Sequence, residues 1–116
     1  MNKPELITAG TFHYTIYTYR TEDGMEFFKF SYHEVDDGYE VDIHYHPDFG
    51  HRSTSPYTIH TLSSSRDQVD KMICFTVGKK SQTFSGAQEM SRHWAEMIHL
   101  YIQTGETIDE QIAKHH

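Results

Sequence analysis

Apolar and polar side chains alternate with a period of two through much of the first half of the chain, which predicts β-strands. Residues 11–19 alternate in this way, and so do the residues on either side of Asp37-Gly38. These segments are rich in aromatic and β-branched residues, which favour strands. Short Asp-Gly segments separate them, as is typical of hairpins, so we expect neighbouring strands to pair antiparallel.

A two-residue turn at Asp37-Gly38 suits the positive φ angles that tight hairpins need. The register that it sets produces one aromatic and aliphatic face and one polar, histidine-rich face. The expected pairs are Tyr32–Ile43, Phe30–Tyr45 and Glu34–Val41 on the apolar face, and His33–Asp42, Ser31–His44 and Lys29–His46 on the polar face.

The preceding hairpin has two alternative registers. A three-residue loop ending at Gly24 would align Phe12, Tyr14 and Ile16 with the apolar face, whereas a two-residue loop would reverse the faces. The position of His13 stays open between these alternatives. In the three-residue register a patch for a protein partner would form on the polar face from Tyr17, Tyr19 and Phe27.

Two further strands are predicted, over residues 57–62 and 71–77, for a total of about five. After residue 84 the apolar period changes to that of a helix. Ser85 with Gln88 forms a capping box and Gly105 a C-terminal stop, which predicts a helix over residues 85–104. A second capping box, Thr107 with Glu110, predicts a short terminal helix over residues 107–114.

These elements predict one α+β domain over residues 1–116, an antiparallel meander with the amphipathic helix on its apolar face. The expected core contacts join Trp94, Met90 and Ile98 of the helix to Phe30, Ile43 and Phe75 of the strands.

Residues 73–102 resemble the C-terminal end of a pleckstrin-homology domain. The resemblance rests on Phe75 in a strand and on Trp94 in the amphipathic helix that follows. It implies that two strands lead into a capping helix with a core tryptophan. The basic phosphoinositide-binding loop of that family has no match between Gly10 and Phe30, so the resemblance does not extend to lipid binding.

Composition narrows the classes of partner. Asp and Glu outnumber Lys and Arg by 17 to 10, for a formal charge of −7, and the basic residues are scattered. This argues against nucleic acid or an anionic membrane as a partner. Cys74 is the single cysteine, and the N-terminal residues do not resemble a signal peptide, so we expect a cytoplasmic protein.

Histidine is the candidate chemistry, because ten occur in 116 residues. In a strand His44 and His46 would share one face, and the loop after Pro47 could return another histidine to them. Imidazole nitrogens suit Zn or Ni. The candidate metal ligands are His44, His46, His51 and His60, with Asp42, Asp48 and His33 as groups that could orient them. The alternative interpretation is a solvated polar sheet face.

The shared face also predicts pH-dependent behaviour. Protonated His33, His44 and His46 would gain Asp42 as a partner, which would raise their pKa values. His33 beside Asp42 could also act as an oriented general base, although cross-strand pairs of this kind are common in sheets. No serine stands in a nucleophile elbow and no glycine-rich phosphate loop occurs.

The sequence therefore favours a non-catalytic binding or interaction domain that pairs with a protein partner or with copies of itself. A metal-binding protein or metal-dependent enzyme is the alternative function.

Overall fold

The computed structural model describes residues 3–9, 12–66, 68–74 and 80–114, with side chains from residue 15 onward. The strands are β1 (Lys3–Ala9), β2 (Phe12–Arg20), β3 (Phe27–Val35), β4 (Gly38–Tyr45), β5 (Thr61–Ser63) and β6 (Lys71–Ile73). The helices are α1 (Pro56–Ile59), α2 (Phe84–Thr104) and α3 (Ile108–Lys114).

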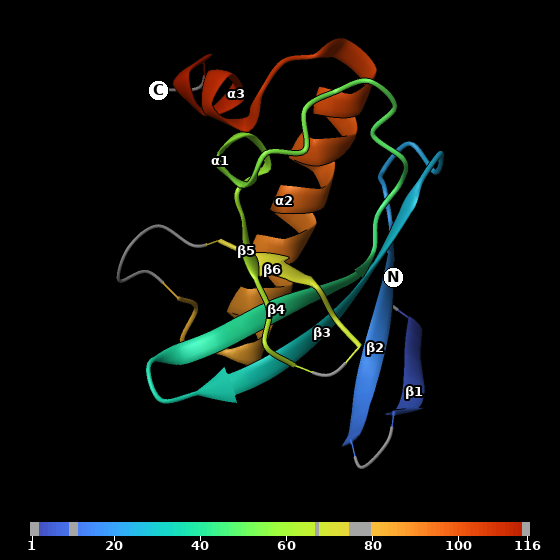
Figure 1. Cartoon of the computed structure of the whole chain (residues 1–116), viewed down its shortest axis with the longest axis vertical. Helices are drawn as coiled ribbons and strands as arrows, with labels where there is room; N and C mark the ends of the chain where they lie inside the picture. The colour runs from blue at the N-terminus through green and yellow to red at the C-terminus, as the bar shows by residue number, and fades with distance from the viewer. Residues whose placement is uncertain (1–2, 10–11, 67, 75–79, 115–116) are drawn as a thin grey trace.

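The strands among the described residues form one six-stranded antiparallel sheet in the order β1-β2-β3-β4-β6-β5. The long helix α2 lies along one face of the sheet, and α1 and α3 lie at the same end of it (Figure 1). The predicted α+β class is thus confirmed. The meander continues as far as β4, after which β6 takes the place beside β4 and β5 becomes the edge strand.

The β3–β4 hairpin turns one residue earlier than predicted. Val35 pairs with Gly38, so Asp36-Asp37 forms the turn and Gly38 begins β4. The register therefore differs by two residues from the expected one, and Ser31 rather than His33 lies opposite Asp42. Because side chains alternate with a period of two, this shift exchanges partners but leaves Ser31, His33 and Asp42 on their predicted face.

The β2–β3 connection has neither of the two expected loops, and its strand faces are reversed relative to the three-residue register. Gly24 has a positive φ of 75°, as expected, but the loop runs from Thr21 to Glu26 and pairs Tyr17 with Phe30. The backbone N–H of Thr21 donates to the carbonyl of Glu26, which closes this longer loop. A shift by an odd number of residues exchanges the two faces of a strand, so Tyr17 and Tyr19 face α2.

The core lies between α2 and the sheet. Trp94 is only 2% exposed and meets the rings of Phe28 and Phe30 edge to face. Its indole N–H donates to the carbonyl of Ile59 over 2.8 Å, which ties α1 to α2. The predicted contacts of Trp94 and of the buried Ile98 with this core are confirmed, whereas Phe75 lies outside the described residues.

Residues 57–62 do not form the single strand that their pattern predicts. Pro56 occupies the first turn of α1, where its missing N–H costs nothing, and His60 ends this helix in the left-handed conformation. Only the last part of the segment belongs to β5.

The start of α2 also differs from the prediction, because its N-cap is Thr83, whose hydroxyl accepts from the backbone N–H of Gly86. The helix ends at Gly105 in the left-handed conformation, as predicted. Thr107 and Glu110 form the capping box expected before α3, each side chain accepting from the backbone N–H of the other.

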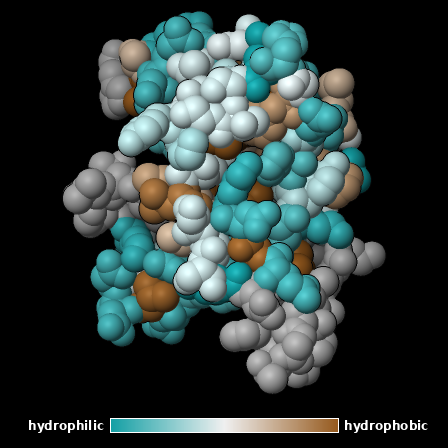
Figure 2. Space-filling view, in the orientation of Figure 1, coloured by the Kyte–Doolittle hydropathy of each residue, from teal (hydrophilic) through white to brown (hydrophobic). Residues whose placement is uncertain are grey.

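Hydrophobic atoms on the face viewed in Figure 2 form small, separated patches among hydrophilic ones. No helix within the described residues is both long enough and apolar enough to cross a membrane.

Candidate functional site

The sheet face opposite α2, here called the outer face, carries a cluster of polar side chains at its centre. Ser31 on β3 and Asp42 on β4 are both completely buried. The Ser31 hydroxyl lies 2.7 Å from the Nε2 atoms of both His33 and His44, so it donates to one ring and accepts from the other. These four residues form the polar cluster.

A loop from later in the chain covers this cluster. The guanidinium of Arg66 donates to Asp42 Oδ1 over 3.1 Å and to Glu40 over 2.6 Å. The Ser64 hydroxyl also donates to Asp42 Oδ1. Lys80 bonds the second oxygen of Glu40, so two cations meet the acidic side chains of β4. Sequence analysis missed Arg66 and Ser64, because their partners lie more than twenty residues away in the chain.

Burial controls the protonation of the cluster. It lowers the pKa of His33 to about 4, helped by the positive charge of Arg66 and opposed by Glu40. Burial also lowers the pKa of His44, although Asp42 opposes the shift. Our expectation that Asp42 would raise these pKa values is therefore wrong, because desolvation outweighs the attraction. Burial raises the pKa of Asp42 itself despite Arg66 and Ser64.

The polar cluster lacks the geometry of a catalytic relay. His33 presents the same atom, Nε2, to Ser31 at 2.7 Å and to Asp42 Oδ2 at 3.4 Å. A relay needs one ring nitrogen toward the nucleophile and the other toward the carboxylate. The Ser31 hydroxyl is also buried, out of reach of a substrate. The arrangement suits a structural polar network more than a general base.

The structure does not bring the four candidate metal ligands together. His46 contacts the carbonyl of Pro47 and the ring of Phe49, while His51 is exposed. His60 Nε2 lies 2.9 Å from Asp109 of α3, whereas His44 contacts Ser31 of β3. Within the part of the chain that the structure describes, no group of three or more His, Cys, Asp or Glu is placed to hold a metal ion.

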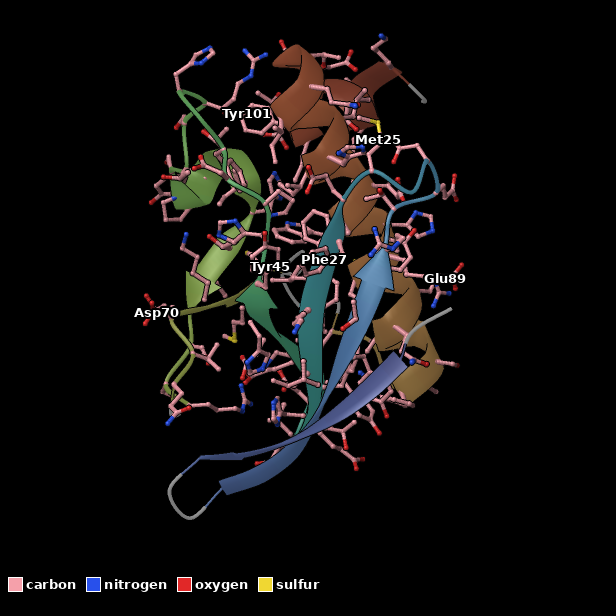
Figure 3. The ribbon with its side chains drawn as sticks, turned by 90° about the vertical axis from the view of Figure 1, so that its right-hand side faces the viewer. Met25, Phe27, Tyr45, Asp70, Glu89 and Tyr101 are labelled. Carbon is pink, nitrogen blue, oxygen red and sulfur yellow. The ribbon has the colours of Figure 1, made fainter. Side chains whose placement is uncertain are left out.

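Tyr17, Tyr19 and Phe27, which were predicted to form one aromatic patch, do not share a face of the sheet. Tyr19 is buried beneath α2, where its hydroxyl donates to Glu96, and Tyr17 packs edge-on against Tyr32. Phe27 does lie on the outer face, but its ring stacks on Tyr45 with centroids 4.7 Å apart. Figure 3 shows Phe27 and Tyr45 next to each other on the sheet.

A β-bulge makes this aromatic pair. The register shifts between Lys29 and Phe30, so Tyr45 pairs with Lys29 and shares its face. His44, one residue earlier, bonds Ser31 on that same face. A bulge can point two successive side chains to one side of a sheet. The bulge has no evident sequence signal, which explains why we expected Tyr45 on the apolar face.

Tyr45 also lines a pocket of about 330 Å³ at the end of the sheet, here called the sheet-end pocket. Three segments meet there: the β2–β3 loop, the chain after β4, and the last turns of α2. Tyr45 is 41% exposed and Met25 is 65% exposed, which leaves both in contact with solvent at this end. The pocket is lined by Met25, Glu26, Tyr45, Pro47, Asp48, His99, Ile102 and Gln103.

The β2–β3 loop that forms one wall is anchored to α2. His99 Nε2 lies 2.7 Å from Asp23, and the backbone N–H of Glu22 donates to Glu96 over 2.9 Å. The backbone N–H of Met25 and the contact with His99 lower the pKa of Asp23 to about 2. Asp48 is the one candidate site residue that lines this pocket, and the other lining residues were not predicted.

Comparison with known proteins places the chain in no family: no family model, no curated protein and no solved structure matches it.

Proposed function

We propose that this chain is a small, non-catalytic binding domain of the cytoplasm that holds its ligand at the sheet-end pocket. The observation that carries the proposal is the exposed ring of Tyr45, which lines this pocket and stacks on the half-buried Phe27. Contact with a ligand removes such rings from water, which is favourable. Binding sites commonly combine an apolar concave surface with a few polar groups, as this one does.

The polar cluster supports the non-catalytic part of the proposal. Ser31 and Asp42 are buried, and the hydrogen bond between His33 and Ser31 joins His33 to the network. A nucleophile must reach its substrate, and a general base must reach the proton that it removes. The metal-dependent alternative is not proposed, because no group of three possible ligands meets within the described residues.

A protein partner or a second copy of this chain would bring the ligand group to the pocket. Tyr45 is exposed at the aromatic end of the outer face, whereas Arg66 crosses its polar end. Sedimentation velocity over a hundredfold range of concentration separates the two occupants, because self-association depends on the concentration of this chain.

The test is a ligand screen read by ¹H–¹⁵N correlation spectra, with cationic, anionic and neutral fragments of side-chain size. We expect shifts confined to residues 24–27, 45–49 and 99–103. Tyr45→Ala should weaken fragment binding at least fivefold, while Tyr57→Ala should leave it unchanged. Tyr57 is a matched control because it is 90% exposed on α1. Shifts confined to the polar cluster, or no binding at all, would overturn the proposal.

A further inference from the structure

The sheet-end pocket combines apolar walls with two carboxylates. Met25, Tyr45 and Ile102 supply the apolar walls, and Glu26 and Asp48 supply the acidic groups. No lysine or arginine lines the pocket among the described residues. The ligand class inferred below rests on the proposed function, because it concerns the same pocket.

Hydrogen bonds fix the Asp48 carboxylate and the backbone of Glu26 without neutralising either acidic side chain. Asp48 Oδ1 accepts from the backbone N–H of Gly50, which fixes the turn after β4. The backbone N–H and carbonyl of Glu26 both bond Thr21, which fixes the position of this residue in the loop. Neither carboxylate forms an ion pair within the described part of the chain.

The end of α2 adds to the negative potential. Ile102 lies in the last turn of this helix, where the backbone carbonyls point outward, and that turn contains no basic side chain. The carbonyl end of a helix attracts cations. The chain already places one there, because Arg52 Nε donates to the carbonyl of Ile102 over 3.3 Å.

Arg52 at the carbonyl of Ile102 and Arg20 over Phe27 offset part of this potential, but neither arginine lines the pocket. The basic side chain of the lining is His99, and its Nε2 is paired with the carboxylate of Asp23 at 2.7 Å. Glu26 and Asp48 then leave the pocket negative. An anionic ligand would be repelled, and a neutral ligand would leave two carboxylates without a partner as it displaced their water.

We propose that the sheet-end pocket binds an organic cation, namely an ammonium or guanidinium group carried on an apolar chain. The apolar chain contacts Met25, Tyr45 and Ile102, and the charge faces Glu26 and Asp48. A tyrosine ring also attracts cations through its π-face, as the ring of Phe27 does for Arg20 at 5.8 Å. Such a group could come from a lysine or arginine side chain of a protein or from a free amine.

The experiment titrates three blocked amino acids into ¹⁵N-labelled protein at pH 7.5 and low salt: the N-acetyl, N-methylamide derivatives of lysine, norleucine and glutamate. We expect the lysine derivative to bind at least fivefold more tightly than norleucine, its neutral counterpart, and the glutamate derivative not to bind. Titration of 1,5-diaminopentane distinguishes the sources, because tighter binding of the blocked lysine indicates a side chain and tighter binding of the diamine a free amine.

The variant Glu26→Gln/Asp48→Asn should lose this preference, since asparagine keeps the oxygen that accepts from Gly50. Glu34→Gln is the matched control, because Glu34 is exposed near the opposite end of β3, and it should bind lysine as the wild type does. Equal binding of lysine and norleucine derivatives would overturn the cation proposal and leave the binding domain intact. Binding of no probe at this pocket would overturn both proposals.

Discussion

At the scale of single residues, Arg66 is the main group that stabilises the buried negative charge of Asp42. Its side chain is fully buried, and Oδ1 receives the hydrogen bonds of Ser64 and Arg66. Oδ2 has no hydrogen-bond partner among the described residues and lies 3.4 Å from His33 Nε2. A buried carboxylate is costly unless an opposite charge and hydrogen bonds accompany it.

We therefore predict that Arg66→Met destabilises the fold by about 2–4 kcal/mol, because it leaves Asp42 and Glu40 without their shared cation. Urea unfolding measures the loss. The double variant Arg66→Met/Asp42→Asn should recover part of it, since the buried charge is gone. Lys80→Met is the comparison and should cost clearly less, because Lys80 also pairs with the exposed Asp37. Equal losses for the two single variants would show that Asp42 does not need Arg66.

Among core substitutions, we expect the loss of the Trp94 side chain to reduce the free energy of unfolding most. Trp94→Ala removes ring contacts with Phe28 and Phe30 and leaves the carbonyl of Ile59 without its indole donor. The expected cost is about 3–5 kcal/mol in urea unfolding. Trp94→Phe keeps a ring and should cost clearly less. A loss below about 1 kcal/mol for the alanine variant would be inconsistent with a buried Trp94.

At the scale of elements, the β3–β4 hairpin packs against the chain that enters α2. The backbone N–H of Tyr39 donates to the carbonyl of Ser81, and the Gln82 amide donates to the carbonyl of Asp37. Gly38 has a φ of +139°, and a Cβ there would lie 2.7 Å from the carbonyl oxygen of Ser81. This close approach explains why the turn uses Asp36-Asp37 and reserves Gly38 for the first position of β4.

Gly38→Ala should therefore destabilise the protein by about 3 kcal/mol, because backbone strain and a backbone clash act together. Gly24→Ala is the control, since Gly24 also has a positive φ but no atom lies within 4 Å of its added Cβ. That variant should cost about 1 kcal/mol from strain alone. Thermal or urea unfolding of both variants gives the difference, and similar losses would mean that the contact with Ser81 yields easily.

At the scale of the whole molecule, the half-buried His33 and His44 make stability depend on pH. The folded pKa of His33 is about 4, below its ordinary value of 6.5. Below pH 6.5 the unfolded chain binds a proton that the folded chain does not, so stability falls with pH down to about 4. His44 acts in the same direction. Asp42, whose folded pKa is raised, opposes the fall as pH drops through that raised value.

We predict that His33→Gln flattens this dependence. Between pH 7 and pH 4.5 the wild type should lose about 2 kcal/mol more free energy of unfolding than the variant. Urea unfolding at half-unit pH steps measures both profiles. His93→Gln is the matched control, because His93 is exposed on α2 and should leave the profile unchanged. Parallel profiles for wild type and His33→Gln would mean that His33 is solvated in the folded state.

The sequence alone determined the α+β class, the long helix and most of the buried residues, because periodicities of 2.0 and 3.6 are local properties. It also assigned Ser31, His33 and Asp42 to one polar face, since a register shift of two leaves faces unchanged. Tertiary structure decided the rest. The number of residues in the β2–β3 loop decided that Tyr17 and Tyr19 face α2. Contacts between this loop and α2 fix its conformation.

Almost none of the candidate site could be predicted from the sequence, because segments distant in the chain form it. Arg66 reaches Asp42 across 24 residues of sequence, and the sheet-end pocket joins the β2–β3 loop, the chain after β4 and the end of α2. Tyr45 lines that pocket because of a β-bulge, and the residues around the bulge carry no sequence signal that predicts it. His44 and His46 line one pocket beside β6, but the strand ends at Tyr45 and the His46 ring contacts the carbonyl of Pro47. Local pattern describes which way a side chain points, whereas packing between distant segments decides what it meets.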